Sequence, residues 1–257
     1  MKKKLIVEFL GTFFLMYVAA SSIIGQQPLA ALAIGAALMI AIYAGAAVSG
    51  GHFNPIVSLA HWRRGKLGTS ELPQYIGVQI VAAALAAWLS QVVQDVYVNA
   101  FVTATFDAAA KARRPWELPI VLSEFIPSFM LVYISLQLTA TKKLAGNPFF
   151  GLIIGVTASI GIIVSYSVSG GLLNPALSVG ICMLGLKKWI PGLLLLWLGQ
   201  FAGGFAAAEV FHRTSADGDP PATVPKGGDV HHDILPPPEP DHVPVVKTVV
   251  PPVPPQG

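Results

Sequence analysis

The stretches SGGHFNP at residues 49–55 and SGGLLNP at residues 169–175 decide the fold, because each lies among apolar segments long enough to cross a membrane. The Asn-Pro of each stretch opens a shorter apolar piece, at 54–62 and 174–184, that is too short to cross. Pieces of about ten residues are candidates for re-entrant half-helices. One Asn-Pro marks a turn or helix start as often as a site, whereas two matched copies indicate a repeat.

Six other apolar segments approach the ~20 residues that a hydrocarbon core of ~30 Å requires. They run over 5–24, 29–49, 73–94, 117–140, 148–168 and 189–211. The chain of 257 residues is 54% hydrophobic and only 11% charged, whereas a soluble domain is usually about a quarter charged. The composition therefore places the chain among membrane proteins and argues against a nucleic-acid-binding surface.

The second half of the chain repeats the first. The stretch Glu8-Phe9-Leu10 in the first span parallels Glu124-Phe125-Ile126 in the fourth, and each half has three spans with one half-helix between the second and third. Because three is odd, the second half enters the membrane from the opposite side, and the two halves are inverted. Such repeats place the functional site at their interface near the midplane. We expect an all-α membrane protein of six transmembrane helices plus two re-entrant half-helices.

This organisation divides the chain into residues 1–94, a connecting extracellular loop at 95–116, a second half at 117–212 and a tail at 213–257. The tail contains 12 of the 21 prolines, a density that prevents helix formation and predicts a disordered cytoplasmic segment. Lys and Arg residues before the tail favour the side of the N-terminus by 9 to 5. Both termini are therefore expected in the cytoplasm.

Asn and Pro suit the start of a half-helix for separate reasons. Pro has no N–H and a preset φ, so Pro55 and Pro175 fit the first helical position. The side-chain oxygen of Asn54 or Asn174 can cap a backbone N–H of the first turn, which leaves the NH₂ group free to donate into a pore. The preceding Gly pairs allow irregular backbone, whose exposed carbonyls are tolerated in a membrane only where they line a polar path.

Two half-helices that enter from opposite faces bring their positive ends together at the centre of the membrane. That field disfavours cations, protons included. The amides of Asn54 and Asn174 can meanwhile hold the oxygen of a passing water or alcohol. The pattern predicts a filter for neutral molecules that is built from dipoles.

These motifs resemble the major intrinsic protein family, the aquaporins and glycerol facilitators. The resemblance covers about residues 5–211 and is carried by both Asn-Pro boxes, by EFLGTF at 8–13, by Glu124-Phe125 and by QYIGVQ at 74–79. It implies an aquaporin-like fold and a homotetramer with one pore per subunit. It also implies that the carboxylates of Glu8 and Glu124 accept hydrogen bonds from the backbone of the re-entrant loops. A proton-carrying role of these two residues is the sharper alternative.

Three residues depart from the family pattern. Ile56 stands where Ala is usual, which predicts altered packing or width at the midplane. Leu177 stands where the family almost always has Arg, and Ser178 stands where glycerol facilitators carry Asp. Loss of the Arg removes donors and positive charge from the outer constriction. The resemblance then implies an outer filter of Ile34, Ile162, Gly171 and Leu177, which either admits less polar solutes or gates by dewetting.

The expected site has three parts. The pore midplane consists of Asn54, Pro55, Ile56, Asn174, Pro175 and Ala176. The pore-lining backbone consists of Gly51, His52, Phe53, Gly170, Leu172 and Leu173. The outer filter and the two supporting carboxylates complete it.

The leading hypothesis is a passive channel for water or small uncharged solutes in the plasma or inner membrane. The alternatives are an ion-coupled inverted-repeat transporter and a structural membrane protein with a closed pore. We expect no enzyme activity, because no nucleophile–base pair or phosphate loop is evident. The single cysteine, Cys182, argues against a disulfide framework, and we expect no metal or cofactor. The expected partners are the lipid bilayer, water and small neutral solutes.

Overall fold

The computed structural model describes residues 1–94, 117–141, 144, 146–184 and 190–215, and within these ranges it forms eight α-helices and no strand. The helices are α1 (Lys2–Ile24), α2 (Ala30–Ser49), α3 (Pro55–Arg63), α4 (Leu72–Val93), α6 (Leu118–Ala140), α7 (Phe150–Ser169), α8 (Pro175–Met183) and α9 (Ile190–Thr214). The loop at 95–116 and the tail beyond residue 215 lie outside the described residues.

Six of these helices, all except α3 and α8, are long and apolar enough to cross a membrane. Their ends lie within three residues of the predicted ends, and α3 and α8 begin at the two prolines of the Asn-Pro boxes. The predicted all-α fold of six spans and two half-helices is confirmed.

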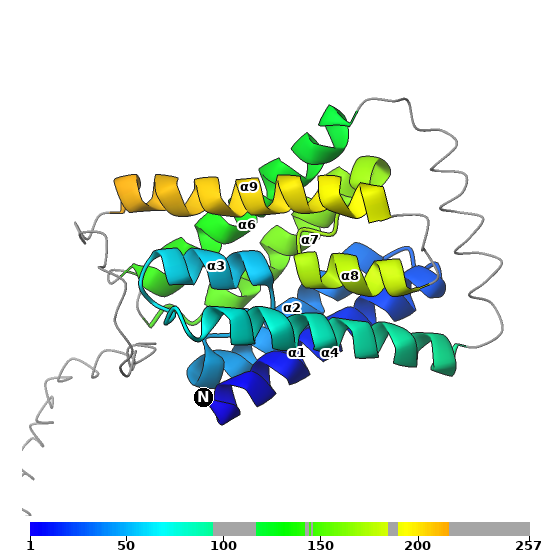
Figure 1. Ribbon diagram of the computed structural model, residues 1–257, viewed down its shortest axis with the longest axis horizontal. Coiled ribbons are helices and arrows are strands. Elements are labelled where there is room, and N and C mark those ends of the chain that lie inside the picture. The colour runs from blue at the N-terminus through cyan, green and yellow to red at the C-terminus, as the bar shows by residue number, and fades with distance from the viewer. Residues whose placement is uncertain (95–116, 142–143, 145, 185–189, 216–257) are drawn as a thin grey trace, which may run out of the picture.

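The two halves pack in the same way. In the first half α1 packs against α2 and α4, and in the second half α6 packs against α7 and α9. The halves meet where α2 packs on α7, and each half-helix packs on the last span of the other half, α3 on α9 and α8 on α4. Figure 1 shows α3 and α8 lying in line, end to end, between α9 and α4.

The contact between α2 and α7 depends on glycine. A Cβ added to Gly35 would lie 2.4 Å from the carbonyl oxygen of Gly155, and a Cβ on Gly155 would lie 2.5 Å from the carbonyl oxygen of Gly35. The two backbones therefore touch at this crossing. Small residues serve this purpose in membranes, where close packing rather than the hydrophobic effect holds helices together.

The outer surface of the bundle is apolar. Large side chains on every span, for example Ile6, Leu85, Leu122, Val164 and Leu198, are more than two-fifths exposed. A surface of this kind requires a hydrocarbon environment, and it fits the length of the six spans.

One face of the bundle carries the described ion pairs. Lys4 at the start of α1 pairs with Glu71 just before α4 at 3.2 Å, and Arg63 at the end of α3 pairs with Glu209 near the end of α9 at 2.7 Å. We call this face, where α1 begins and α9 ends, the N-terminal face.

Candidate functional site

Asn54 and Asn174 cap the two half-helices in the predicted manner. The Oδ1 atom of Asn54 accepts a hydrogen bond from the backbone N–H of Ile56 at 3.1 Å, and Oδ1 of Asn174 accepts one from Ala176 at 3.0 Å. Both Asn residues have extended backbone, and the prolines that follow occupy the first helical positions. The caps satisfy backbone donors that would otherwise be exposed at the centre of the bundle.

The amide groups of the two caps join the halves. Nδ2 of Asn54 donates to the carbonyl oxygen of Leu173 at 3.0 Å, and Nδ2 of Asn174 donates to the carbonyl oxygen of Phe53 at 2.9 Å. One N–H of each amide is thus used within the protein, a bond that the sequence did not predict. Within the described residues, the second N–H of each amide is left to donate into the cavity.

The loops before the half-helices have the same unusual backbone in both halves. Gly50 and Gly170 have φ angles of 89° and 93°, and Phe53 and Leu173 have φ angles of 48° and 49°. Left-handed backbone is uncommon for residues with a Cβ, and it persists only where surrounding contacts hold it. Here it turns the Phe53 and Leu173 carbonyls toward the amide of the opposite half.

In the first half, Glu8 makes many of the contacts that hold this loop backbone in place. Its fully buried carboxylate accepts hydrogen bonds from the Ser49 hydroxyl at 2.7 Å and from the backbone N–H groups of His52 and Phe53 at 2.9 and 2.7 Å. Nε2 of Gln79 adds a fourth at 2.8 Å. The carboxylate is thus an acceptor for donors that a buried loop could not otherwise satisfy.

Glu124 repeats this arrangement in the second half. It accepts from the Ser169 hydroxyl at 2.5 Å, from the backbone N–H groups of Leu172 and Leu173 at 3.1 and 2.9 Å, and from Nε2 of Gln200 at 2.7 Å. The same set of four donors, one hydroxyl, two backbone N–H groups and one Gln amide, therefore surrounds both carboxylates.

Gln79 and Gln200 were missed as site residues by sequence reasoning. Each also donates to a half-helix hydroxyl, Gln79 to Ser58 at 3.0 Å and Gln200 to Ser178 at 3.1 Å. One signal was present, because both lie in the third span of their half at nearly equal distances from the Asn-Pro. A polar residue that recurs at matched places in two apolar spans is a candidate partner for a buried charge.

A cavity of about 800 Å³ runs between the halves and has Asn54 and Asn174 in its wall. Gln26 and Gln27 line its end opposite the N-terminal face, together with Tyr166 and Ser167. Toward the N-terminal face the wall includes His52.

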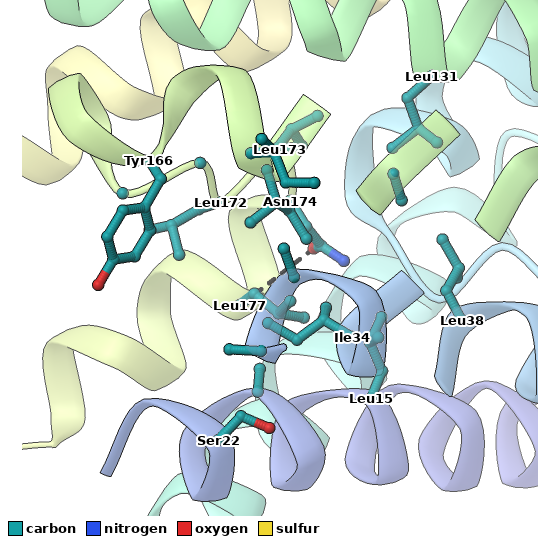
Figure 2. A pocket seen from close by; sticks show the side chains of 18 of the residues that line it. Leu15, Ser22, Ile34, Leu38, Leu131, Tyr166, Leu172, Leu173, Asn174 and Leu177 are labelled. Atoms are coloured by element: carbon teal, nitrogen blue, oxygen red, sulfur yellow. Dashed lines mark hydrogen bonds between the residues drawn. The ribbon is translucent and has the colours of Figure 1, made fainter. Parts of the chain in front are cut away.

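The four residues expected in the outer filter all lie in the wall of this cavity: Ile34, Ile162, Gly171 and Leu177. The side chains of Ile34 and Leu177 come from α2 and α8, and Figure 2 shows them next to one another below the Asn174 amide. Gly171 contributes only backbone, since a Cβ there would lie 2.6 Å from the carbonyl oxygen of Ile162. The structure thus brings these four residues together in the wall of one cavity.

Other expected pore residues lie behind the wall. Ile56 is fully buried and packs in a cluster with Val132 and Phe211, close to Gly204 of α9. The side chain of Phe53 fills a space beside Gly11 and Gly45. Among the described residues, the cavity wall includes Gly51, His52, Gly170, Leu172 and Leu173 of the expected set, but not Phe53, Pro55, Ile56, Pro175 or Ala176. The unusual Ile56 therefore changes helix packing rather than pore width.

Comparison with known proteins agrees with this architecture. The family model described as "Major intrinsic protein" matches residues 1–211. The chain is 32% identical over 222 residues to aquaporin NIP1-4 of Oryza sativa subsp. japonica, which covers 84% of this chain and 78% of that protein. It is also 32% identical over 188 residues to glycerol uptake facilitator protein-like 6 of Lactiplantibacillus plantarum. This alignment covers 69% of this chain and 82% of that protein.

Among solved structures, the aquaglyceroporin from Plasmodium falciparum superposes with a TM-score of 0.57 at 18% identity, over 81% of this chain and 94% of that one. This similarity concerns the fold. Since the family match spans residues 1–211, the chain belongs to the major intrinsic protein family and is an integral membrane protein.

Proposed function

We propose that the protein is a passive channel for water or small uncharged solutes. The observation that carries the proposal is the pair of amides at the wall of one cavity, where two half-helix N-termini meet in the middle of a six-span bundle. The relatives named aquaporin and glycerol uptake facilitator support the same class of function.

The charge pattern of the site favours neutral cargo. The N-termini of α3 and α8 point at the same place and carry the positive ends of their dipoles. A cation there meets two positive ends and, among the described cavity-lining residues, finds no carboxylate. A neutral molecule with an oxygen atom can accept hydrogen bonds from the remaining N–H groups of Asn54 and Asn174. Because it has no charge, it does not pay the electrostatic cost that a cation meets there.

The outer filter in this proposal consists of Ile34, Ile162, Gly171 and Leu177. It offers aliphatic side chains and, at Gly171, backbone. A water molecule that enters this part of the cavity finds few hydrogen-bond partners in the wall. A solute with an apolar side pays a smaller free-energy cost on leaving bulk water, because its apolar surface is favourably removed from water. We therefore infer that the filter passes solutes less polar than glycerol at least as readily as it passes glycerol.

Orientation and assembly are part of the proposal. The described N-terminal face carries Lys4, Arg63 and Arg64, which favours a cytoplasmic location for that face and for both termini. A homotetramer with one pore per subunit is expected from family membership.

The test is stopped-flow light scattering of the full chain in lipid vesicles, with water, glycerol, urea and ammonia compared against protein-free vesicles. A channel raises at least one permeability, and the flux does not depend on a proton or sodium gradient. Flux that requires such a gradient would establish the ion-coupled transporter instead. Permeabilities equal to those of empty vesicles for every solute would favour the closed structural protein.

A further inference from the structure

The wall of the cavity contains equivalent residues from the two halves. Residues of the half-helices and of the spans before them are equivalent when they are 120 positions apart, as Asn54 and Asn174 are. Each of the four outer-filter residues has an equivalent in the other half, and all four equivalents also lie in the cavity wall. These equivalents are Ile42, Gly51, Val57 and Ile154.

Two of the four lie on the spans α2 and α7, on the N-terminal side of the two amides. α1 begins at the N-terminal face, so α2 runs back across the bundle and ends there, and Ile42 lies in its second half. α7 begins at this face, since the hydroxyl of Tyr43 on α2 donates to the carbonyl oxygen of Pro148 at 2.7 Å. Ile154 lies in the first half of α7, and the outer-filter isoleucines lie in the opposite halves of these helices.

The other two lie on the first re-entrant segment. Gly51 precedes the Asn54 cap, and Val57 lies in the first turn of α3, which ends with Arg63 on the N-terminal face. Gly51 and Gly171 have the same φ of 65°. The four equivalents therefore surround the cavity on the N-terminal side, as the outer filter does on the other side.

The two sets have the same chemical character. The aliphatic side chains of the second set are 4–7% exposed, and those of the outer filter are 5–8% exposed. None of these six side chains has a hydrogen-bonding group, and each glycine adds only backbone. Figure 2 shows wall residues on both sides of the Asn174 amide, with Tyr166 and Leu177 on one side and Leu38 and Leu131 on the other.

Polar side chains are present on both sides as well. The wall includes Ser22 near the end of α1 and Ser135 near the end of α6, which lies at the N-terminal face. His52 is a further polar residue on the N-terminal side. Its ring lies beside that of Tyr75, with centroids 5.2 Å apart, and its Nδ1 atom is 3.1 Å from Oγ of Ser58. These two contacts are with residues behind the cavity wall.

We propose that Ile42, Gly51, Val57 and Ile154 form a second filter, which we call the inner filter, in series with the outer one. The inference rests on the proposed channel function and narrows its substrate class. A solute must lose water hydrogen bonds at an aliphatic level before the Asn pair and again after it. The favoured cargo is then a small neutral molecule with few hydroxyl groups, because every further hydroxyl is penalised at both levels.

Two barriers in series have a kinetic signature, because their resistances to flux add. A hydroxyl placed in one filter gives glycerol about one hydrogen bond, which lowers that barrier about fivefold in rate. The untouched filter then limits the flux, and the total permeability rises by no more than about twofold. Hydroxyls in both filters raise it about fivefold, which exceeds the product of the two single effects.

The experiment measures glycerol permeability by stopped-flow light scattering of vesicles that contain the full chain. Ile162→Thr changes the outer filter, and Ile42→Thr changes the equivalent residue of the inner filter. We expect each single variant to raise the permeability by no more than about twofold and the double variant to raise it about fivefold.

Two controls use the same substitution. Ile34→Thr combined with Ile162→Thr alters the outer filter twice, and the increase should stay at about twofold because the inner filter is intact. Ile40→Thr and Ile160→Thr change equivalent residues on α2 and α7 that are 52% and 56% exposed on the outer surface, and they should have no effect.

The inference is overturned if the Ile42→Thr, Ile162→Thr double variant gives no more than the product of the single effects. It is also overturned if Ile162→Thr alone gives the full increase and Ile42→Thr gives none. Thermal unfolding in detergent identifies any variant that does not fold, and Ile34→Thr with Ile154→Thr then provides the second pair.

Permeability of the wild-type protein to water, urea or ammonia, compared with protein-free vesicles, tests the channel function separately. If the wild type conducts none of them, two intact filters still predict glycerol flux in the double variant. Absence of that flux excludes the inner filter.

Discussion

The side-chain amide of Asn54 donates a hydrogen bond to the carbonyl oxygen of Leu173, 119 positions later in the chain, and Asn174 returns the same bond to Phe53. The two caps thus exchange bonds across the centre of the bundle. Each amide holds the opposite loop with one N–H and offers the other N–H to the cavity. In the proposed channel, stability and selectivity therefore depend on the same two side chains.

Replacement of Asn54 by Asp tests this double role. The carboxylate cannot donate to the Leu173 carbonyl. It also places a negative charge where, in the proposed channel, the two helix dipoles exclude cations. We expect the free energy of unfolding to fall by about 1–3 kcal/mol and a cation leak to appear. A pH-sensitive dye inside vesicles measures the leak.

Asn174→Asp is the matched variant in the other half. Because the bonds are reciprocal, it should produce a leak of similar size. Vesicles that remain as tight to protons as the wild type with both variants would contradict a cation barrier at the two amides.

Replacement of Glu124 by Gln should destabilise the protein strongly. The carboxylate accepts from two backbone N–H groups, a hydroxyl and the Gln200 amide, and Gln presents one oxygen and an NH₂ group to these four donors. We expect the free energy of unfolding to fall by roughly 3 kcal/mol, because buried donors lose their partner.

Thermal unfolding in detergent provides the measurement for Glu124→Gln. Glu71→Gln is the control, since that carboxylate makes a partly exposed ion pair with Lys4, which should contribute no more than about 1 kcal/mol. Equal effects of the two substitutions would be inconsistent with a special role of Glu124.

Replacement of Leu177 by Arg should narrow the range of solutes. The guanidinium adds donors and a positive charge beside Ile34 and Ile162 in a cavity wall that is otherwise aliphatic at this level. We expect permeability to the less polar solutes to fall at least about tenfold, which corresponds to about 1.4 kcal/mol of barrier. Stopped-flow measurements on a series of small alcohols provide the comparison.

Leu177→Met is the control for the filter, because it keeps the volume and the apolar character of the residue. It should leave the order of solute permeabilities unchanged. If Leu177→Arg also leaves the order of solute permeabilities unchanged, the filter does not lie at Leu177.

Replacement of Gly35 by Ala tests the crossing of α2 and α7. The added Cβ would lie 1.9 Å from Oγ of Ser159 and 2.4 Å from the Gly155 carbonyl oxygen, so the helices must move apart. We expect a loss of about 1–3 kcal/mol in the free energy of unfolding, the usual cost of overpacking.

Gly77→Ala is a matched change, because no atom lies within 4 Å of an added Cβ there. It should be neutral or stabilise the protein by up to about 1 kcal/mol through helix propensity. The difference between the changes in melting temperature of the two variants removes any general effect of replacing Gly by Ala.

The sequence by itself determined the spans, the half-helices and their inverted order. These depend on local properties, namely apolar length, the Asn-Pro caps and the Gly pairs, so their positions were predicted to within a few residues. The four positions expected in the outer filter came from the resemblance to the family, by counting along the chain from Asn54 and Asn174. All four lie in the cavity wall.

Only the tertiary structure decided which side chains meet. The sequence could not show that the amide of Asn54 binds Leu173, that Gln79 and Gln200 complete the carboxylate networks, or that Ile56 faces α9 instead of the pore. It likewise gave no sign that the ring of His61 lies beside the ring of His52, with 4.4 Å between their centroids. Each relationship joins residues on different elements and depends on how the helices are rotated and how closely they approach, which is set by packing between the halves rather than by any local pattern.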